Sequence, residues 1–150
     1  MVKPRCNLPD LVNGTLIKRG VKLVRNPFNR SYFTYVGSKW EKFNLTWALR
    51  SGSPPEANLP ISFALKTWAD SSVFRFSKAS LFEAADVKIS FYSGIHYDNI
   101  PFEEDDLAHS FYPPRGELHF NADVTWVVDF RGSHCDTADI ETIAFHELGV

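Results

Sequence analysis

Alternation of apolar and polar residues predicts a set of β-strands along the middle of the chain. Leu45, Trp47 and Leu49 alternate with polar or small neighbours, and residues 87–91 repeat that pattern. This two-residue period is typical of strands that bury one face, because successive side chains point to opposite sides of a sheet. Shorter segments of similar character predict three further strands, at residues 73–76, 107–112 and 118–120.

Two other segments carry apolar residues at helical spacing. The first has the i, i+3, i+4, i+7 pattern of one buried helical face: Ile61, Ala64, Leu65 and Trp68. The second lies near the end of the printed sequence: Ile140, Ile143, Ala144 and Leu148. Pro60 suits the first turn of the earlier helix, and Asp139 can cap the later one. The order strand, helix, several strands, helix predicts an α/β fold with a mixed sheet.

Composition indicates a globular chain of one domain. Its 150 residues are 44% hydrophobic, which is enough for a substantial core. The net charge of −2 leaves no basic footprint, so nucleic acid is not expected as a partner. No run of 18 apolar residues occurs, so no transmembrane segment is expected, and the first residues lack the apolar region of a signal peptide. Residues 11–31 have no steady periodicity and predict a linker.

Candidate chemistry begins on the last predicted helix. His146 and Glu147 match the start of the H-E-x-x-H motif, in which two histidines on one helical face hold Zn²⁺ and the glutamate acts on its bound water. The second histidine belongs at position 150, which is Val150. By itself this half motif is weak, because a His-Glu pair in a helix is more often an ordinary surface or core feature.

A second group of candidate ligands spans 24 residues: His96, Asp98, His109 and His119. Three imidazole nitrogens and one carboxylate oxygen make the closed tetrahedral set that is typical of structural zinc. Alternation within the strand at 118–120 sends His119 to the face opposite its apolar neighbours. The alternative interpretation is three solvated histidines, and the residues alone leave both open.

Several motifs in order resemble the matrix metalloproteinases, the matrixins of the metzincin clan, and most of all the plant-type members. The segment around Cys6, Pro-Arg-Cys-Asn-Leu-Pro-Asp, is similar to the family's P-R-C-G-x-P-D switch. The sequence His96-Tyr-Asp98 with Pro101-Phe102 is similar to its H-G-D…P-F loop. The remaining matches are Leu-Ala-His-Ser-Phe at 107–111, Leu-His-Phe-Asn-Ala-Asp at 118–123, Trp126, and the helix at 139–147.

The resemblance implies a zincin-like α+β fold, a metzincin catalytic domain with a mixed, twisted sheet and two helices. It also implies a function for each matched residue. The four residues of the second group would bind structural zinc, His146 would be the first ligand of the catalytic zinc, and Glu147 the general base. Cys6 would occupy the metal's open position in a latent form. Extended peptide or protein substrates would lie along the edge strand and contact three of its residues: Leu107, Ala108 and Ser110. Location outside the cell is also implied.

Departures from the family pattern bear on calcium. The family's calcium loop is rich in glycine, whereas the shortened segment here contains the acidic run 103–106. The family has Asp and Glu at the positions of Asn121 and Val124, and valine cannot ligate. The remaining candidate oxygen ligands are Asp86, Glu103 and Asn121. We therefore expect weak calcium binding or none. Asn7 also replaces the glycine of the switch.

The end of the printed sequence sets a further expectation. With Val150 in place of histidine, and without the third histidine or the Met-turn, one catalytic-zinc ligand of three is present. We expect residues 1–31 to be a propeptide remnant with switch and activation linker, and 32–150 the N-terminal part of a catalytic domain truncated in the active-site helix. Such a chain is expected to be inactive. The alternatives are a non-catalytic zinc-binding or regulatory fragment and an unstable truncated gene product.

Overall fold

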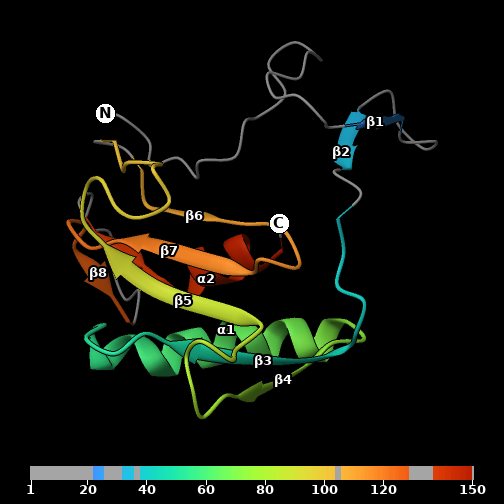
Figure 1. Cartoon of the computed structure of the whole chain (residues 1–150), viewed down its shortest axis with the longest axis horizontal. Helices are drawn as coiled ribbons and strands as arrows, with labels where there is room; N and C mark the ends of the chain where they lie inside the picture. The colour runs from blue at the N-terminus through green and yellow to red at the C-terminus, as the bar shows by residue number, and fades with distance from the viewer. Residues whose placement is uncertain (1–21, 26–31, 36–37, 104–105, 129–136, 150) are drawn as a thin grey trace.

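The computed structural model of the protein describes residues 22–25, 32–35, 38–103, 106–128 and 137–149 (Figure 1). In order along the chain, the elements in these ranges are β1 (Lys22–Arg25), β2 (Tyr32–Tyr35), β3 (Asn44–Leu49), the 3-10 helix η1 (Pro55–Ala57), α1 (Asn58–Ser71), β4 (Arg75–Lys78), β5 (Val87–Tyr92), β6 (Ala108–Ser110), β7 (Glu117–Asn121), β8 (Trp126–Val127), β9 (Ala138–Asp139) and α2 (Ile140–Leu148). The predicted α/β order is confirmed. No helix within these ranges is long and apolar enough to cross a membrane.

Five strands form one mixed sheet in the order β4-β3-β5-β7-β6. Strands β4, β3, β5 and β7 run parallel to their neighbours, whereas β6 pairs antiparallel with β7 at the edge. The register of β5 and β7 aligns Lys88 with Glu117 and Tyr92 with Asn121. In the antiparallel pair, His109 lies opposite His119. This pairing brings together two histidines that the alternation pattern had placed on different strands.

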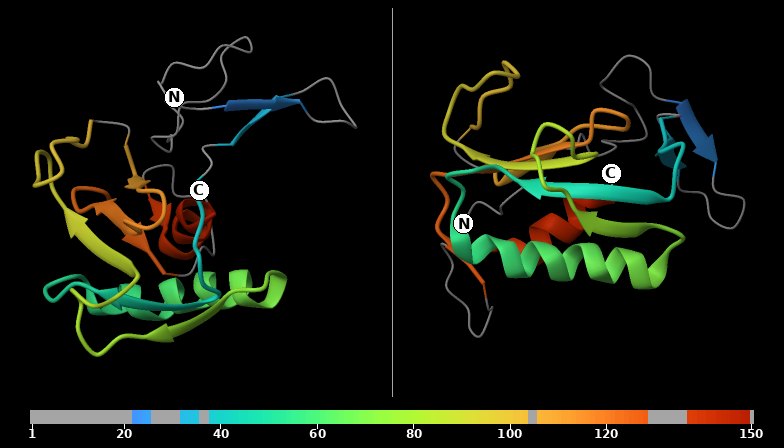
Figure 2. Two further views of the ribbon diagram at one scale, coloured as in Figure 1. Left: turned by 45° about the vertical axis from the view of Figure 1, so that its right-hand side comes forward. Right: turned by 60° about the horizontal axis from the view of Figure 1, so that its bottom comes forward.

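Both helices pack on the same face of this sheet (Figure 2). The predicted stripe on α1 is buried, with Ile61 and Ala64 both 0% exposed. On the sheet, alternate residues of β5, β7 and β6 join the same core: Val87, Ile89, Leu118, Phe120 and Ala108. Since side chains alternate across a strand, the histidines of β6 and β7 lie on the opposite, helix-free face.

Helix α2 is held at its start and along its side. The Asp139 side chain accepts a hydrogen bond from the Thr142 backbone N–H at 2.7 Å, which confirms the predicted N-cap. Trp68 of α1 donates its indole N–H to the Phe145 carbonyl at 2.8 Å and stacks on the Phe145 ring at a centroid distance of 4.9 Å. Gly149 also lies against this indole, because a Cβ there would be 2.5 Å from it. Helix α1 therefore fixes where α2 presents its residues.

The start of β5 is joined to β3 through a carboxylate. Asp86 accepts hydrogen bonds from the Thr46 backbone N–H at 2.8 Å and from the Thr46 hydroxyl at 2.9 Å, and it pairs with Lys42 at 2.7 Å. Burial raises the pKa of Asp86, but the hydrogen bonds from Lys42 and Thr46 outweigh it and leave the pKa below its ordinary value of 3.8. Gly116, at φ +59, crosses directly over this point, where a Cβ would lie 2.3 Å from the Asp86 carbonyl.

The structure differs from the sequence predictions at several boundaries. Residues 72–74 close α1 instead of starting a strand, because the Ser72 hydroxyl donates to the Trp68 carbonyl and accepts from the Phe74 N–H, so β4 begins at Arg75. β6 is shorter than 107–112, although the Phe111 N–H still donates to the Glu117 carbonyl.

Within the predicted linker at residues 11–31, residues 22–25 form a short strand, β1, that pairs with β2. The short parallel pair of β8 and β9 was not predicted. Cys6, Cys135 and Val150 lie outside the described residues.

Candidate metal centre and active-site helix

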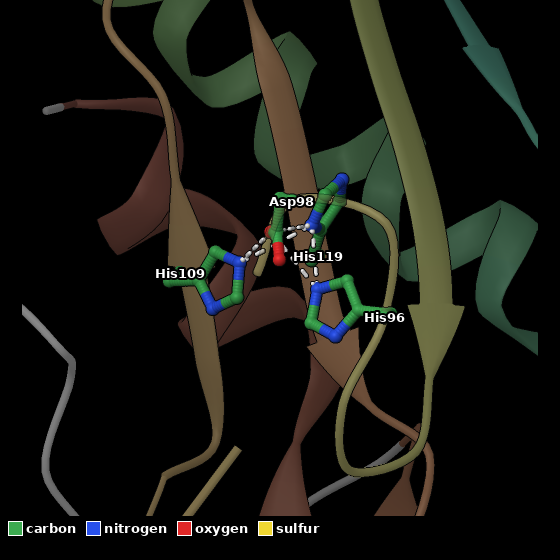
Figure 3. A group of neighbouring side chains, drawn as sticks. All are labelled: His96, Asp98, His109 and His119. Carbon is green, nitrogen blue, oxygen red and sulfur yellow. Dashed lines mark hydrogen bonds and ion pairs between the residues drawn. The ribbon is translucent and has the colours of Figure 1, made fainter. Parts of the chain in front are cut away.

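Four side chains from three elements converge on the helix-free face of the sheet (Figure 3). β6 carries His109 and β7 carries His119, and their direct pairing makes the two rings neighbours. The loop after β5 brings His96 and Asp98 over the same face. We call these four residues the histidine cluster. They are the set for which the sequence predicted structural zinc, and the structure brings all of them together.

The Asp98 carboxylate lies at the middle of the cluster. Its Oδ2 atom is 2.9 Å from His96 Nε2, 2.8 Å from His109 Nε2 and 2.9 Å from His119 Nδ1. His119 Nδ1 is in turn 3.1 Å from His96 Nε2 and 3.2 Å from His109 Nε2. The four side chains are between 0% and 7% exposed. Such a set of inward-facing nitrogens around one carboxylate is shielded from solvent.

These donors fit a tetrahedral zinc ion in type and in spacing. One ligand atom from each residue lies within 4.8 Å of all the others. Zinc bonds of about 2.0–2.1 Å place tetrahedral ligands roughly 3.3 Å apart, a few tenths of an ångström beyond the separations in the cluster. Three nitrogens and one oxygen leave no open position, which is the character of a structural site and not of a catalytic one.

Protonation at neutral pH also suits metal binding. Burial raises the pKa of Asp98, but the Ile100 N–H and the nearby histidines outweigh it and lower that pKa to about 2. Burial and the neighbouring His109 lower the pKa of His119 to about 4. The carboxylate is therefore ionised and the His119 imidazole neutral, as ligands must be.

The loop that bears His96 and Asp98 has its own local supports. His96 Nδ1 lies 3.1 Å from the Gly94 carbonyl, and the Asp98 Oδ1 atom accepts from the Ile100 N–H at 2.9 Å. The His96 ring stacks on Tyr92 of β5 at 4.8 Å. These contacts fix the direction of both side chains.

The other candidate residues lie on α2, on the far side of the sheet from the cluster. His146 is exposed, whereas Glu147 is 3% exposed. The Ser110 hydroxyl of β6 donates to Glu147 Oε2 at 2.8 Å, and Glu147 Oε1 has no hydrogen-bond partner within the described part of the chain. His146, the expected ligand, and Glu147, the expected base, thus point in different directions from one helix. The sequence prediction treated these two residues as a pair and did not detect the contact between Glu147 and Ser110.

The edge strand offers main-chain groups at alternate residues. The Leu107 carbonyl accepts from the Asn121 N–H at 2.8 Å and the Phe111 N–H donates to the Glu117 carbonyl at 2.8 Å, so these residues face β7. By the alternation of an antiparallel ladder, the main chains of Ala108 and Ser110 face the open edge. Of the three predicted substrate contacts, Leu107 therefore directs its carbonyl into the sheet.

The candidate calcium ligands are held apart. Asp86 precedes β5, while Asn121 aligns with Tyr92, six residues further along that strand. At about 3.3 Å per residue these positions lie roughly 20 Å apart. Asp86 is engaged by Lys42, and the Asn121 side chain bonds the Asp106 carbonyl and the Asp123 N–H. Asp86 and Asn121 are therefore too far apart to bind one ion together, and the three candidate calcium ligands, Asp86, Glu103 and Asn121, stay a prediction.

The fold is α/β, and the histidine cluster on its sheet could hold a metal ion. Residues 39–150 match the family model for matrixin, the M10 peptidases, and the chain belongs to this family. Metalloendoproteinase 2-MMP of Arabidopsis thaliana is 34% identical over 169 residues, which cover 99% of this chain and 45% of the relative. Matrix metalloproteinase-25 of Mus musculus is 32% identical, with 99% and 25% covered. Interstitial collagenase of Equus caballus is 34% identical, with 99% and 29% covered. The chain spans less than half the length of each relative.

Proposed function

We propose that this chain is the structural-zinc part of a zinc-dependent metalloendopeptidase of the matrixin type. The observation that carries the proposal is the histidine cluster, whose four donors fit zinc in chemistry and spacing. His96, Asp98, His109 and His119 would hold the ion. A closed four-ligand site supplies no reactive water, so its contribution is to fix the loop after β5 onto β6 and β7.

The peptidase activity is proposed for a complete catalytic domain. In such a site zinc lowers the pKa of a bound water and polarises the substrate carbonyl, and it needs three protein ligands with one open position. Residues 1–150 supply His146, with Val at position 150, so they do not fit a catalytic zinc. The part that this chain contributes is Glu147, held by Ser110 as the candidate general base.

An extended peptide is the proposed substrate. Ala108 and Ser110 direct main-chain groups to the open edge of β6, where a peptide can add as a further strand. The same strand carries the hydroxyl that contacts Glu147, so bound peptide and candidate base would lie on adjoining parts of β6 and α2.

Latency and location are proposed from the sequence resemblance alone. Cys6 would be the thiolate ligand of a switch within residues 1–31, ahead of a catalytic domain that begins near residue 32. Action outside the cell follows the same resemblance. Calcium dependence is not part of the proposal, because the candidate ligands are separated along β5 and β7.

Metal analysis tests the zinc site. Protein purified with zinc and then exposed to mild chelation should hold about one zinc per chain, and His109→Ala should lose it and unfold more easily, because its imidazole is a ligand and its site is buried. His146→Ala is the matched control: it removes an exposed imidazole and should keep the ion. Undiminished zinc in His109→Ala would contradict the assignment.

A peptidase assay tests the second part. The polypeptide of residues 1–150 should give background cleavage of quenched peptides, because one imidazole does not hold Zn²⁺ in a catalytic site. Thiol modification of Cys6 should not change this result. Chelator-sensitive cleavage that disappears in Glu147→Ala would show that Val150 does not prevent catalysis. The observation of Val at position 150 also favours the second candidate function, a non-catalytic zinc-binding module.

A further inference from the structure

The outer side of the His119 ring is occupied by a tyrosine. Tyr97 lies between two members of the histidine cluster in sequence, and its hydroxyl is 3.1 Å from His119 Nε2. The Tyr97 ring packs edge-on against His119 at 5.4 Å and against Tyr92 at 5.6 Å. Although the residue is 58% exposed, its hydroxyl is directed at a buried imidazole.

The Tyr97 hydroxyl has a second polar neighbour, a carboxylate. The Tyr97 hydroxyl interacts with the Glu117 carboxylate, and it carries a proton that it can donate, since a tyrosine hydroxyl ordinarily titrates only near pH 10. Glu117 Oε2 is 4.0 Å from His119 Nε2 and accepts from Arg115 Nε at 2.6 Å. The Arg115 guanidinium lies 3.5 Å from the centroid of the Phe111 ring. This contact helps to hold Arg115, and with it the Glu117 carboxylate, in place.

The direction of the hydrogen bonds follows from which nitrogen faces the cluster. His119 Nδ1 points at Asp98, His96 and His109, so an ion bound there leaves the proton on Nε2. The Nε2–H then donates to the Tyr97 oxygen, and the Tyr97 O–H is left to donate toward the neighbouring Glu117 carboxylate. The other two imidazoles differ: His96 Nδ1 lies near a backbone carbonyl, and His109 Nδ1 has no partner among the described residues.

We propose that Tyr97, with Glu117 behind it, is a positioning residue for zinc that fixes the His119 imidazole in the tautomer and orientation in which Nδ1 binds the ion. The inference rests on the proposed zinc site and adds a function for two residues outside it. Metal-binding histidines commonly donate their other N–H to such a partner, and loss of the partner costs about 10–100-fold in metal affinity.

The test is zinc affinity, measured by competition with a chromophoric chelator on the whole chain. Tyr97→Phe removes only the hydroxyl and should weaken zinc binding by about 10–100-fold. Glu117→Gln should weaken it in the same direction, and the double variant should lose less than the product of the two, because both act through one nitrogen. Tyr112→Phe, the same change on the β6–β7 loop, is the control and should bind zinc like the wild type.

Two further measurements distinguish a loss of positioning of the His119 imidazole from a general destabilisation of the fold. The melting temperature of metal-free Tyr97→Phe should match that of metal-free Tyr112→Phe, and the visible absorption of the Co²⁺-loaded form should shift in Tyr97→Phe alone. Wild-type affinity in Tyr97→Phe, or an equal loss in Tyr112→Phe, overturns the inference and leaves the zinc site standing. A wild-type chain that binds no zinc overturns the proposed site and the inference together.

Discussion

At the scale of single residues, the stability of the fold depends on a few positions that have no room for one additional atom. Gly116 is the clearest of them. It adopts a left-handed conformation at the point where the chain enters β7, and it passes over the carbonyl of Asp86 and the indole of Trp40. A side chain there meets backbone, which cannot move aside as a flexible side chain can.

Gly116→Ala should therefore destabilise the fold by more than about 2 kcal/mol, since it adds a clash to the backbone strain. Gly52→Ala is the matched control, because Gly52 also has a positive φ but open space around it, and should cost only about 1 kcal/mol. Denaturant unfolding of both variants measures the difference. Equal losses would mean that the chain relaxes around the new methyl group.

Asp86 gives a pH-dependent prediction. Its folded pKa is below 3.8, so its ionised form stabilises the fold above that pH, and this contribution disappears as the pH falls through the folded pKa. Asp86→Asn should lower the free energy of unfolding by about 1–2 kcal/mol at pH 7, with the exposed Lys42 contributing little of it. Unfolding curves at falling pH should show the variant and the wild type converging below about 3.8. A gap independent of pH would contradict an effect of charge. Asp70→Asn, on the surface of α1, is the control.

At the scale of elements, the spacing of apolar residues predicted which segments pack as strands and helices. Local hydrogen bonds decide at which residue each segment ends. The alternation at 87–91 and the stripe on α1 follow directly from burial of one face, and both are confirmed. The predicted start of β4 was early because Ser72 terminates α1 through its hydroxyl, a contact that apolar patterning does not register. The contact of Tyr97 with His119 and that of Ser110 with Glu147 were not predicted, for a similar reason. Each joins residues from different elements, and the spacing of residues along the chain does not encode such a contact.

At the scale of the whole molecule, the histidine cluster could be predicted as a set because all four donors are of the right type and His119 alternates away from the core. The candidate calcium ligands were chosen by residue type and not by their place in the sheet, so their predicted function stays a prediction. Asp86 and Asn121 lie toward opposite ends of two paired strands.

Millimolar calcium should accordingly raise the melting temperature of the zinc-loaded chain little, since the carboxylates needed to surround the ion with six to eight oxygens are separated. Thermal melts with calcium and with a calcium-selective chelator measure this. A large upward shift would mean that the acidic residues 103–106 form a site of their own, which Glu103→Gln should then weaken.

The pairing of His109 with His119 has a consequence for where zinc affinity comes from. Asp98 and His109 are 11 residues apart, and His109 and His119 are 10 apart. Closing a loop of that size in a free chain costs about 2–3 kcal/mol of conformational entropy. The hydrogen-bonded ladder of β6 and β7 closes the second loop before any ion arrives, and the pairing of β5 with β7 brings the loop that carries Asp98 to the same part of the sheet. A detached peptide of residues 96–119 holds the same four donors yet must close both loops on binding, at about 4–6 kcal/mol together, which amounts to a zinc affinity weaker by roughly 10³- to 10⁴-fold. In this sense the backbone of the sheet would contribute to the proposed zinc site as much as any side chain that touches the ion.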